Sequence, residues 1–312
     1  MSLFLGLDTS NYTTSAALYN SETKEMVQAK QLLPVKSGEM GIRQSDAVFH
    51  HVKQMPEVIG RLPFAQNEPI TAVAASDRPQ QFEGSYMPCF LVSAGLGQQL
   101  AAVNCVPCYH FTHQQGHVAA ALFGSGRTDL FSQRFIAFHV SGGTTDALLV
   151  QPDEESILNC RVVAHSLDLK AGQLVDRVGG MLGLDFPAGP ALEQLAAKSA
   201  RMFRVRPTLR GADCHLSGVE NQCRTMFDAG EEPADVAAFC MASVLAAISG
   251  MANVLKEQFG DLPMVFAGGV MSNAFLRKQL SAAFNGSFAP PAFSADNAAG
   301  IALLGSMRHG NV

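Results

Sequence analysis

Two histidines four residues apart, His113 and His117 in "THQQGHVAAAL", are the residues of this chain whose type and spacing most suggest chemistry. On a helix this spacing puts both imidazoles on one face, as in many helical metal sites. Two partly buried histidines that are satisfied by backbone carbonyls are the alternative. A metal site needs a third ligand, and the best candidate is Asp296 in "FSADNAAGIA", although a plain helix N-cap gives the same pattern.

Three turns rich in glycine and hydroxyl groups form a second set. "DTSNYTTSAAL" and "HVSGGTTDALL" each place backbone amides and small hydroxyls at the tip of a hairpin, where they can bind phosphate oxygens. "FAGGVMSN" joins a strand to a helix through glycines, which commonly directs backbone amides at a phosphate or sugar. Each turn alone is also what an ordinary tight turn requires. Their order along the chain predicts a two-lobed, actin-like, ATP-binding α/β fold.

The elements that must position these turns alternate between strand and helix. We expect strands at 3–7, 13–19 and 70–76, and helices at 46–62 and 87–103, the last broken by its glycines. "VPCYHF" is expected to be a short strand that leads into the histidine helix, and the chain beyond about residue 171 to be mostly helical.

The size of the chain predicts more than one lobe, because 312 residues with 47% hydrophobic content exceed an ordinary single domain. We assign residues 1–128 and 297–312 to the first lobe and 129–296 to the second, with the metal and nucleotide site in the cleft between them. No membrane-spanning segment and no basic leader is predicted, so we expect a cytoplasmic protein. The seven cysteines are an odd set and indicate reduced thiols.

Charge limits the choice of partners. The net charge of −5 argues against unaided nucleic-acid binding, so an RNA substrate requires partner subunits or a local basic patch. The only local basic run is "RMFRVRPTLRG", with Arg201, Arg204, Arg206 and Arg210. A solvated loop is the favoured interpretation of this run, and contact with an RNA backbone is the alternative.

Cys105 and Cys108 in "NCVPCYH" could form a redox pair or a zinc site together with the nearby histidines. Because a strand alternates its faces, two thiols three residues apart point to opposite sides. The sequence therefore favours small hydrophobic residues in a core over chemistry at this pair.

The order of these motifs resembles the TsaD/Gcp family, the tRNA threonylcarbamoyl-adenosine transferases formerly called O-sialoglycoprotein endopeptidases, over nearly the whole chain. The matching stretches are "LGLDTS", "VPCYHFTHQQGH", "HVSGGTTDALL", "AGQLVDRVGGMLGLDFPAGP", "LSGVE", "FAGGVMSN" and "SADNAAGIA". The resemblance implies the actin-like (ASKHA) fold and transfer of a threonylcarbamoyl group from a carbamoyl-adenylate to an adenosine of tRNA. It also implies that His113, His117 and Asp296 bind one divalent metal, iron or zinc.

The resemblance further implies ATP or threonylcarbamoyl-adenylate as the nucleotide ligand. Its phosphates are expected at the "VSGG" loop, its ribose at the Asp of "LVDR", and further contacts at "PAGP" and "FAGGVMSN", in addition to the first hairpin tip. The expected nucleotide-binding residues are Asp8, Ser10, His139, Val140, Ser141, Gly142, Gly143, Asp176, Gly189, Glu193 and Asn273. The implied partners are tRNA and TsaB-like, TsaE-like or paralogous proteins, without a membrane, in a dimer or hetero-oligomer.

Four departures from the family pattern indicate a divergent paralogue. "SNYTT" replaces "SCDET", "SDRPQQFEGSY" replaces "GPGLVG", Thr144 replaces the His of "SGGHT", and Glu220 replaces the Lys of "FSGLK". No residue is an obvious general base. The changed loops allow a small-molecule carbamoyltransferase as an alternative, and a non-catalytic nucleotide-binding subunit is a second one that the retained histidines disfavour. A protease is the least favoured function, since the histidine helix lacks a Glu base.

Overall fold

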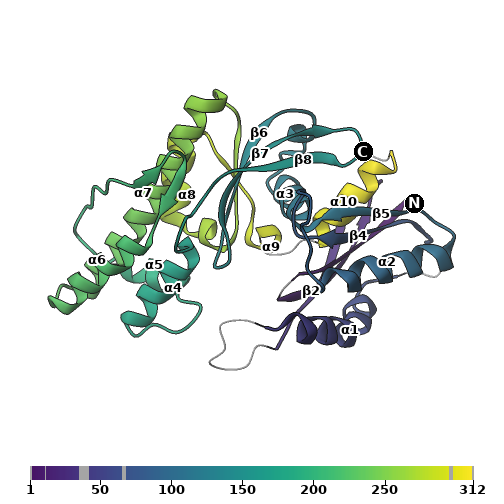
Figure 1. Cartoon of the computed structure of the whole chain (residues 1–312), viewed down its shortest axis with the longest axis horizontal. Helices are drawn as coiled ribbons and strands as arrows, with labels where there is room; N and C mark the ends of the chain where they lie inside the picture. Colours follow the sequence, from purple (N-terminus) through teal and green to yellow (C-terminus); the bar gives the residue numbers. More distant parts are fainter. Residues whose placement is uncertain (1, 11, 35–41, 65–67, 295–297, 311–312) are drawn as a thin grey trace. The chain divides into compact units, whose positions relative to one another are not determined.

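The computed structural model divides into two compact units (Figure 1). The residues that it describes are 2–10, 12–34, 42–64, 68–294 and 298–310. Unit 1 comprises Met1–Gln133, Gln151–Cys160 and Ala292–Val312, and unit 2 comprises Arg134–Val150 and Arg161–Pro291. The boundaries predicted at 128/129 and 296/297 lie a few residues from two of these, whereas the grouping of 151–160 with unit 1 was not expected.

The segment 151–160 belongs to unit 1 because two glutamines hold it there. Gln115 Nε2 donates to the carbonyl oxygens of Ser156 and Leu158, at 2.9 and 2.7 Å. Gln81 Oε1 accepts a hydrogen bond from the Cys160 amide at 2.7 Å. Glutamines carry no sequence signal for such a long-range contact, so this assignment required the structure.

Unit 1 contains a five-stranded sheet in the order β3-β2-β1-β4-β5. Its strands are β1 (Leu3–Thr9), β2 (Thr13–Asn20), β3 (Met26–Leu32), β4 (Ile70–Arg78) and β5 (Cys108–Thr112). β1 and β2 form the predicted antiparallel hairpin, β3 extends it, and β4 and β5 add in parallel. Every residue of β1 is buried, as expected for a central strand between two neighbours.

The helices of unit 1 are α1 (Gln44–Gly60), α2 (Phe90–Asn104), α3 (His113–Gly124), α9 (Pro291–Ser294) and α10 (Ala298–Arg308), with a short 3₁₀ turn η1 (Thr128–Ser132). The predicted break in α2 is wrong, because the helix runs continuously through Gly95 and Gly97. A glycine inside a helix costs only about 1 kcal/mol. A Cβ on Gly97 would lie 3.0 Å from the Cβ of Ala75, so this glycine lets α2 pack closely on β4.

The histidine helix α3 begins where the sequence predicts, because a capping box fixes its first turn. Thr112 Oγ1 accepts from the Gln115 amide, and Gln115 Oε1 accepts from the Thr112 amide. α3 also lies very close to α10, since a Cβ on Gly300 would come within 1.9 Å of the Gly116 carbonyl oxygen. The start of α10 therefore packs beside the first turns of the helix that carries His113 and His117.

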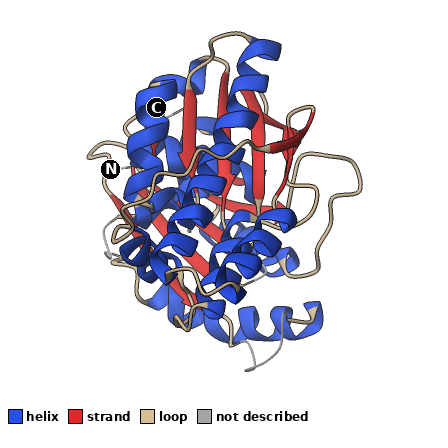
Figure 2. Cartoon of the chain, turned by 90° about the vertical axis from the view of Figure 1, so that its left-hand side faces the viewer, coloured by secondary structure: helices blue, strands red, loops and turns tan. Residues whose placement is uncertain are grey.

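Unit 2 repeats this plan with a second five-stranded sheet in the order β12-β11-β6-β7-β8. Its strands are β6 (Phe135–Val140), β7 (Thr145–Asp153), β8 (Ile157–His165), β11 (Met264–Ala267) and β12 (Ser287–Phe288), and a separate pair is β9 (Thr208–Arg210) with β10 (Asp213–His215). β6 and β7 form the second predicted hairpin, and β11 runs parallel to β6 and β12. In each unit helices (blue) lie against strands (red), as Figure 2 shows.

The helices of unit 2 are α4 (Ala171–Met181), α5 (Gly189–Ala196), α6 (Ser217–Asp228), α7 (Pro233–Phe259) and α8 (Ala274–Phe284), with a 3₁₀ turn η2 (Gly269–Ser272) before α8. The predicted transition from strand through glycine to helix is confirmed in β11, η2 and α8. α7 is long and apolar enough to cross a membrane by length and composition, so the sequence does hold one apolar run of this length, and the expectation of no membrane-spanning segment stays a prediction. Half of its apolar window, 50%, is buried, and α7 contacts α4, α5, α6 and α8 as the central helix of this unit.

The cysteines differ from expectation at one position. Cys105 is exposed and ends α2 in the left-handed conformation, with φ 55°, so it is not a core residue. Cys108 is half-buried on β5, and burial raises the pKa of its thiol. All seven cysteines lie in the described part of the chain and are free.

Candidate nucleotide cavity and histidine pair

The two predicted histidine ligands lie side by side in unit 1. The ring centroids of His113 and His117 are 4.6 Å apart with an interplanar angle of 69°, and the Phe90 ring lies 5.5 Å from His113. Asp296 lies outside the described residues, so its role as third ligand stays a prediction. Among the residues described, no cluster of three or more His, Cys, Asp or Glu side chains could hold a metal.

Asp8 lies beside the histidine pair, in a position that sequence reasoning did not foresee. Its side chain is 1% exposed, and its Oδ1 lies 2.9 Å from Nδ1 of His113. Its other oxygen, Oδ2, is buried and has no hydrogen-bond partner in the described part of the chain. The predicted contact of Asp8 with a phosphate stays a prediction, whereas its contact with His113 is present in the structure.

The first hairpin tip is held by His51 of α1. Its Nε2 lies 2.7 Å from the Ser10 carbonyl oxygen and its Nδ1 lies 2.8 Å from Thr14 Oγ1. Burial lowers the pKa of His51, although the Ser10 carbonyl and the Asp8 carboxylate act in the opposite direction. Sequence reasoning missed His51, since a histidine inside a helix with no partner nearby in sequence gives no signal.

The second hairpin tip is ordered by its own serine. Ser141 Oγ accepts from the amides of Thr144 and Gly143, at 3.1 and 3.3 Å. The Gly142 amide, by contrast, donates to no atom of the residues described here. The first turn of α4 lies directly against this loop: the Gly172 amide donates to the Ser141 carbonyl, and a Cβ on Gly172 would lie 2.5 Å from the Gly142 nitrogen. The loop thus presents an amide near the positive end of a helix, a common anion site.

His139 and Val140 are the last two residues of β6, directly opposite Asp146 and Thr145 of β7. Val140 is fully buried. His139 is half-buried. Burial raises the pKa of Asp146, and nearby Lys170 and His165 oppose this shift.

A cavity of about 520 Å³ in unit 2 brings together five of the predicted nucleotide residues. These residues are Gly142, Asp176, Gly189, Glu193 and Asn273. Two acidic side chains of this set are anchored at helix starts: Asp176 Oδ1 accepts from the Ala188 amide at 2.9 Å, and Glu193 Oε1 accepts from the Ala274 amide at 2.7 Å. Burial raises the pKa of Asp176. Asn273 caps α8 by accepting from the Leu276 amide at 2.9 Å.

A second cavity of about 450 Å³ adjoins the first, since both are lined by Glu193, Met241 and Asn273. Its remaining lining is largely apolar and comes from α7, from Phe275 of α8, and from the end of α5 with the chain that follows it, which adds Phe203 and the polar residues Ser199 and Arg201. No Lys or Arg is among the described residues that line the larger cavity, so an anion there would depend on amides. The Gly142 amide, the carboxylates of Asp176 and Glu193 and the adjoining apolar cavity together suit a nucleoside with a phosphate group.

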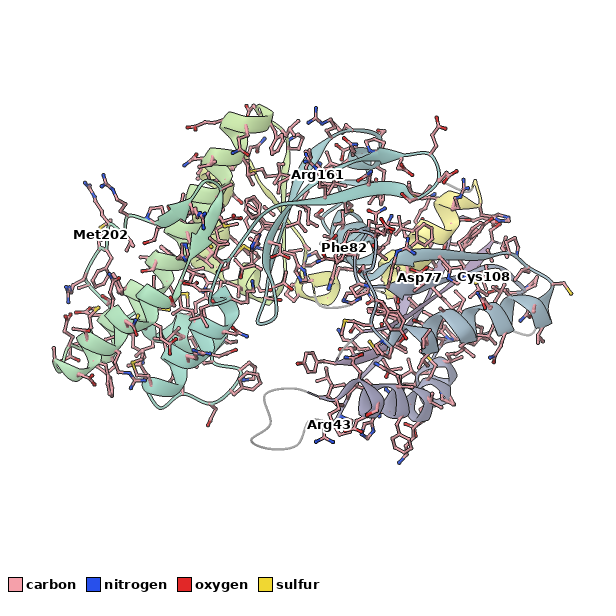
Figure 3. The ribbon with its side chains drawn as sticks, in the orientation of Figure 1. Arg43, Asp77, Phe82, Cys108, Arg161 and Met202 are labelled. Atoms are coloured by element: carbon pink, nitrogen blue, oxygen red, sulfur yellow. The ribbon has the colours of Figure 1, made fainter. Side chains whose placement is uncertain are left out.

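The arginine run forms an extended segment in which exposed and half-buried residues alternate. Arg201 is exposed, in line with the solvated interpretation, and it is paired with Glu231 and Asp235. Arg204, Arg206 and Arg210 are exposed, and their side chains form no hydrogen bond or ion pair with the residues described. Met202 in the same segment is 96% exposed and is labelled in Figure 3.

Comparison with solved structures identifies the fold. Component A of the (R)-2-hydroxyglutaryl-CoA dehydratase of Acidaminococcus fermentans superimposes with a TM-score of 0.58 at 16% identity, covering 99% of this chain and 100% of that chain. Full-length HypF in its phosphate- and nucleotide-bound form gives a TM-score of 0.60 at 14% identity, covering 99% of this chain and 46% of that one. These similarities confirm the predicted actin-like ATPase α/β fold.

Comparison of sequences then identifies the family. The family model of tRNA N6-adenosine threonylcarbamoyltransferase, TsaD, matches residues 26–303. The enzyme of that name from Methanopyrus kandleri is 28% identical over 291 residues, 91% of this chain and 80% of the relative. The enzyme of that name from Bordetella pertussis is 31% identical over 236 residues, which cover 70% of this chain and 66% of the relative. The chain belongs to the TsaD family, as its motifs predict.

Proposed function

We propose that this protein transfers the threonylcarbamoyl group of threonylcarbamoyl-adenylate to the exocyclic amine of an adenosine in tRNA. Membership of the TsaD family supports tRNA threonylcarbamoyl-adenosine modification as the general reaction. The observation that carries the adenylate as donor is the cavity of unit 2, where a glycine loop, two carboxylates and an apolar extension adjoin.

In this cavity each part of an adenylate has a partner of suitable chemistry. The Gly142 amide and the first turn of α4 suit the phosphate, because both offer positive partial charge. The carboxylates of Asp176 and Glu193 can accept hydrogen bonds from ribose hydroxyls. The apolar part of the lining, which includes Met241, suits the flat face of adenine.

The transfer forms one bond and breaks another. The amine nitrogen bonds to the carbamoyl carbon, the bond from that carbon to the phosphate oxygen breaks, AMP leaves, and the amine loses one proton to solvent. Negative charge grows on the phosphate as AMP departs, and a preorganised amide and helix terminus stabilise such charge without reorganising. In this way Gly142 and α4 would favour departure of AMP over return of the acyl group.

His113, His117 and Asp296 would hold one divalent metal, iron or zinc. The described residues fit this role, because the two imidazoles are adjacent and a buried carboxylate oxygen of Asp8 beside them lacks a partner. The close packing of α10 on α3 supports Asp296 as the third ligand, since Asp296 precedes α10 by two positions in the sequence. When bound, such a metal supplies a Lewis acid for the carbamoyl carbonyl.

Arg204, Arg206 and Arg210 are the residues we propose for contact with the tRNA backbone. They are exposed and unpaired among the described residues, and they follow one another along an extended segment. Guanidinium groups bind phosphates bidentately, and such contacts position RNA without reading its sequence. Because the net charge of the chain is −5, binding of RNA phosphates requires a local basic surface, and these three arginines supply one.

The test is incubation of the protein with threonylcarbamoyl-adenylate, unmodified tRNA and partner proteins, followed by mass spectrometry of the nucleosides. Threonylcarbamoyl-adenosine is expected with the wild type and with Asp185→Asn, which changes an exposed carboxylate outside the cavity. Asp176→Ala should weaken adenylate binding and slow the reaction. Release of AMP onto a small amine, with every tRNA left unmodified, would establish the small-molecule carbamoyltransferase instead.

A further inference from the structure

The contact between Asp8 and His113 determines which nitrogen of the histidine carries hydrogen. An ionised carboxylate only accepts hydrogen bonds, so the 2.9 Å contact places hydrogen on Nδ1 of His113. In a neutral imidazole the other nitrogen, Nε2, then has the lone pair that a metal binds. Asp8 comes from β1 and His113 from the start of α3, so the contact joins two elements that are distant in sequence.

The side chain of Asp8 has few polar partners. Its side chain is 1% exposed, and no Lys or Arg of the described residues forms an ion pair with it. Its Oδ2 has no hydrogen-bond partner in the described part of the chain. A buried polar atom without a partner is costly, and native proteins rarely keep one without a reason. The observation calls for positive charge or a hydrogen-bond donor beside this carboxylate.

Two further neighbours of Asp8, Cys89 and His51, do not supply this charge. Burial, and secondarily the Asp8 carboxylate, raise the pKa of Cys89 to about 12, so Cys89 stays a neutral thiol. His51 is buried and its pKa is lowered by desolvation, which favours the neutral imidazole. A cation held by the His113 and His117 imidazoles, whose ring centroids are 4.6 Å apart, would supply it.

We propose that Asp8 is a positioning residue for metal binding: it holds His113 with hydrogen on Nδ1, so that the lone pair that binds a metal is on Nε2, and its buried carboxylate strengthens cation binding by the histidine pair. This inference rests on the metal site of the proposed function. A carboxylate behind a ligating histidine typically contributes roughly 10- to 100-fold to metal affinity. Asp8 then acts on the metal through His113, in addition to any contact with a nucleotide.

The test compares Asp8→Asn and Asp8→Ala in the full-length protein, with Co²⁺ as the probe. The amide of Asn can still accept from Nδ1–H but carries no charge, whereas Ala removes both. We expect Co²⁺ affinity to fall about 10-fold in Asp8→Asn and about 100-fold in Asp8→Ala. Asp213→Ala is the matched control, because it removes a carboxylate 3.4 Å from Nδ1 of His165 in unit 2 and should leave Co²⁺ affinity unchanged.

A second readout needs no metal. Nitrogen NMR of histidine-labelled protein, with His113 assigned through His113→Gln, should show hydrogen on Nδ1 in the wild type and in Asp8→Asn. In Asp8→Ala the hydrogen should move to Nε2. If Asp8→Ala does not fold, the near-isosteric Asp8→Asn still decides the effect of the charge on Co²⁺ affinity.

The outcomes separate this inference from the function on which it rests. Wild-type protein that binds no Co²⁺ would overturn the metal site and the inference together. Wild-type Co²⁺ affinity in both Asp8 variants, or hydrogen on Nε2 of His113 in the metal-free wild type, would overturn the role of Asp8 alone.

Discussion

Replacing Gly172 by alanine would change the nucleotide site without touching a ligand atom. An added Cβ would lie 2.5 Å from the Gly142 nitrogen, 2.6 Å from the Ser141 carbonyl carbon and 2.7 Å from the Gly142 Cα. All three are backbone atoms, so no side chain can rotate away. Either the first turn of α4 or the glycine loop must move, and the Gly142 amide loses its alignment with the helix terminus.

Two opposing effects determine the change in the unfolding free energy of Gly172→Ala. Overpacking of a close contact costs about 1–3 kcal/mol, and alanine in a helix gains about 1 kcal/mol over glycine. The unfolding free energy should therefore fall by at most about 2 kcal/mol. Loss of one hydrogen bond to a charged phosphate costs about 1.5–3 kcal/mol, which corresponds to a roughly 10- to 150-fold weaker affinity for AMP.

Gly180→Ala is the matched control, because Gly180 lies in the same helix and nothing lies within 4 Å of its added Cβ. This variant should gain about 1 kcal/mol in unfolding free energy and bind AMP like the wild type. Urea unfolding measures the stability of each variant, and calorimetric titration measures AMP binding. Equal stability and equal AMP affinity in Gly172→Ala and Gly180→Ala would refute the close approach of α4 to the loop.

Three further predictions concern charged groups. Desolvation opposes ionisation of Asp168, but hydrogen bonds from Leu169, Leu216 and Ser217 outweigh it and lower the pKa of Asp168 to about 2. The Asp168→Ala variant should therefore have an unfolding free energy about 1–2 kcal/mol lower than the wild type at pH 7. Urea unfolding should show this difference between wild type and variant disappear as the pH falls from about 4 to about 2. A difference that does not depend on pH would contradict the lowered pKa of Asp168. Burial raises the pKa of Asp146, so wild-type stability should fall as the pH rises above the ordinary Asp value, and Asp146→Asn should be more stable at pH 7; an equally stable variant would argue against this. Replacing Arg204, Arg206 and Arg210 by Glu should weaken tRNA binding and reduce its salt dependence while AMP binding is unchanged, and an unaltered salt dependence in filter binding would exclude this surface.

Local patterns carried the prediction of the fold. Alternation and turn residues predict both hairpins, and the capping box at Thr112 and Gln115 starts α3 at the histidine pair. The glycines misled the prediction of α2, because the packing of Gly97 on Ala75 is a tertiary contact that propensity does not contain. β3 was not predicted for a similar reason, since only one of its seven residues is buried and pairing with β2 defines it.

The site residues also fall into two groups, those that lie in local sequence motifs and those that only tertiary contacts reveal. Gly142, Asp176 and Asn273 lie in motifs with short-range signals, and the structure places them on one cavity. The contacts of Asp8 with His113 and of His51 with Ser10 join residues 105 and 41 positions apart in the sequence, so only the fold reveals them. Residues that act through another side chain are thus the part of a site that a single sequence conceals most.

Two of the four departures from the family pattern take part in contacts inside a single unit. Glu220, where the family has Lys, accepts from Nη1 of Arg177 at 3.0 Å and joins α6 to α4. Gln81 of the altered "SDRPQQFEGSY" loop holds the segment 151–160. Glu220 and Thr144 are also absent from the described lining of the nucleotide cavity. Changes that are engaged in structural contacts and leave Gly142, Asp176 and Asn273 in place favour an altered acceptor or partner over a lost reaction, so the acceptor is the property that transfer assays should vary first.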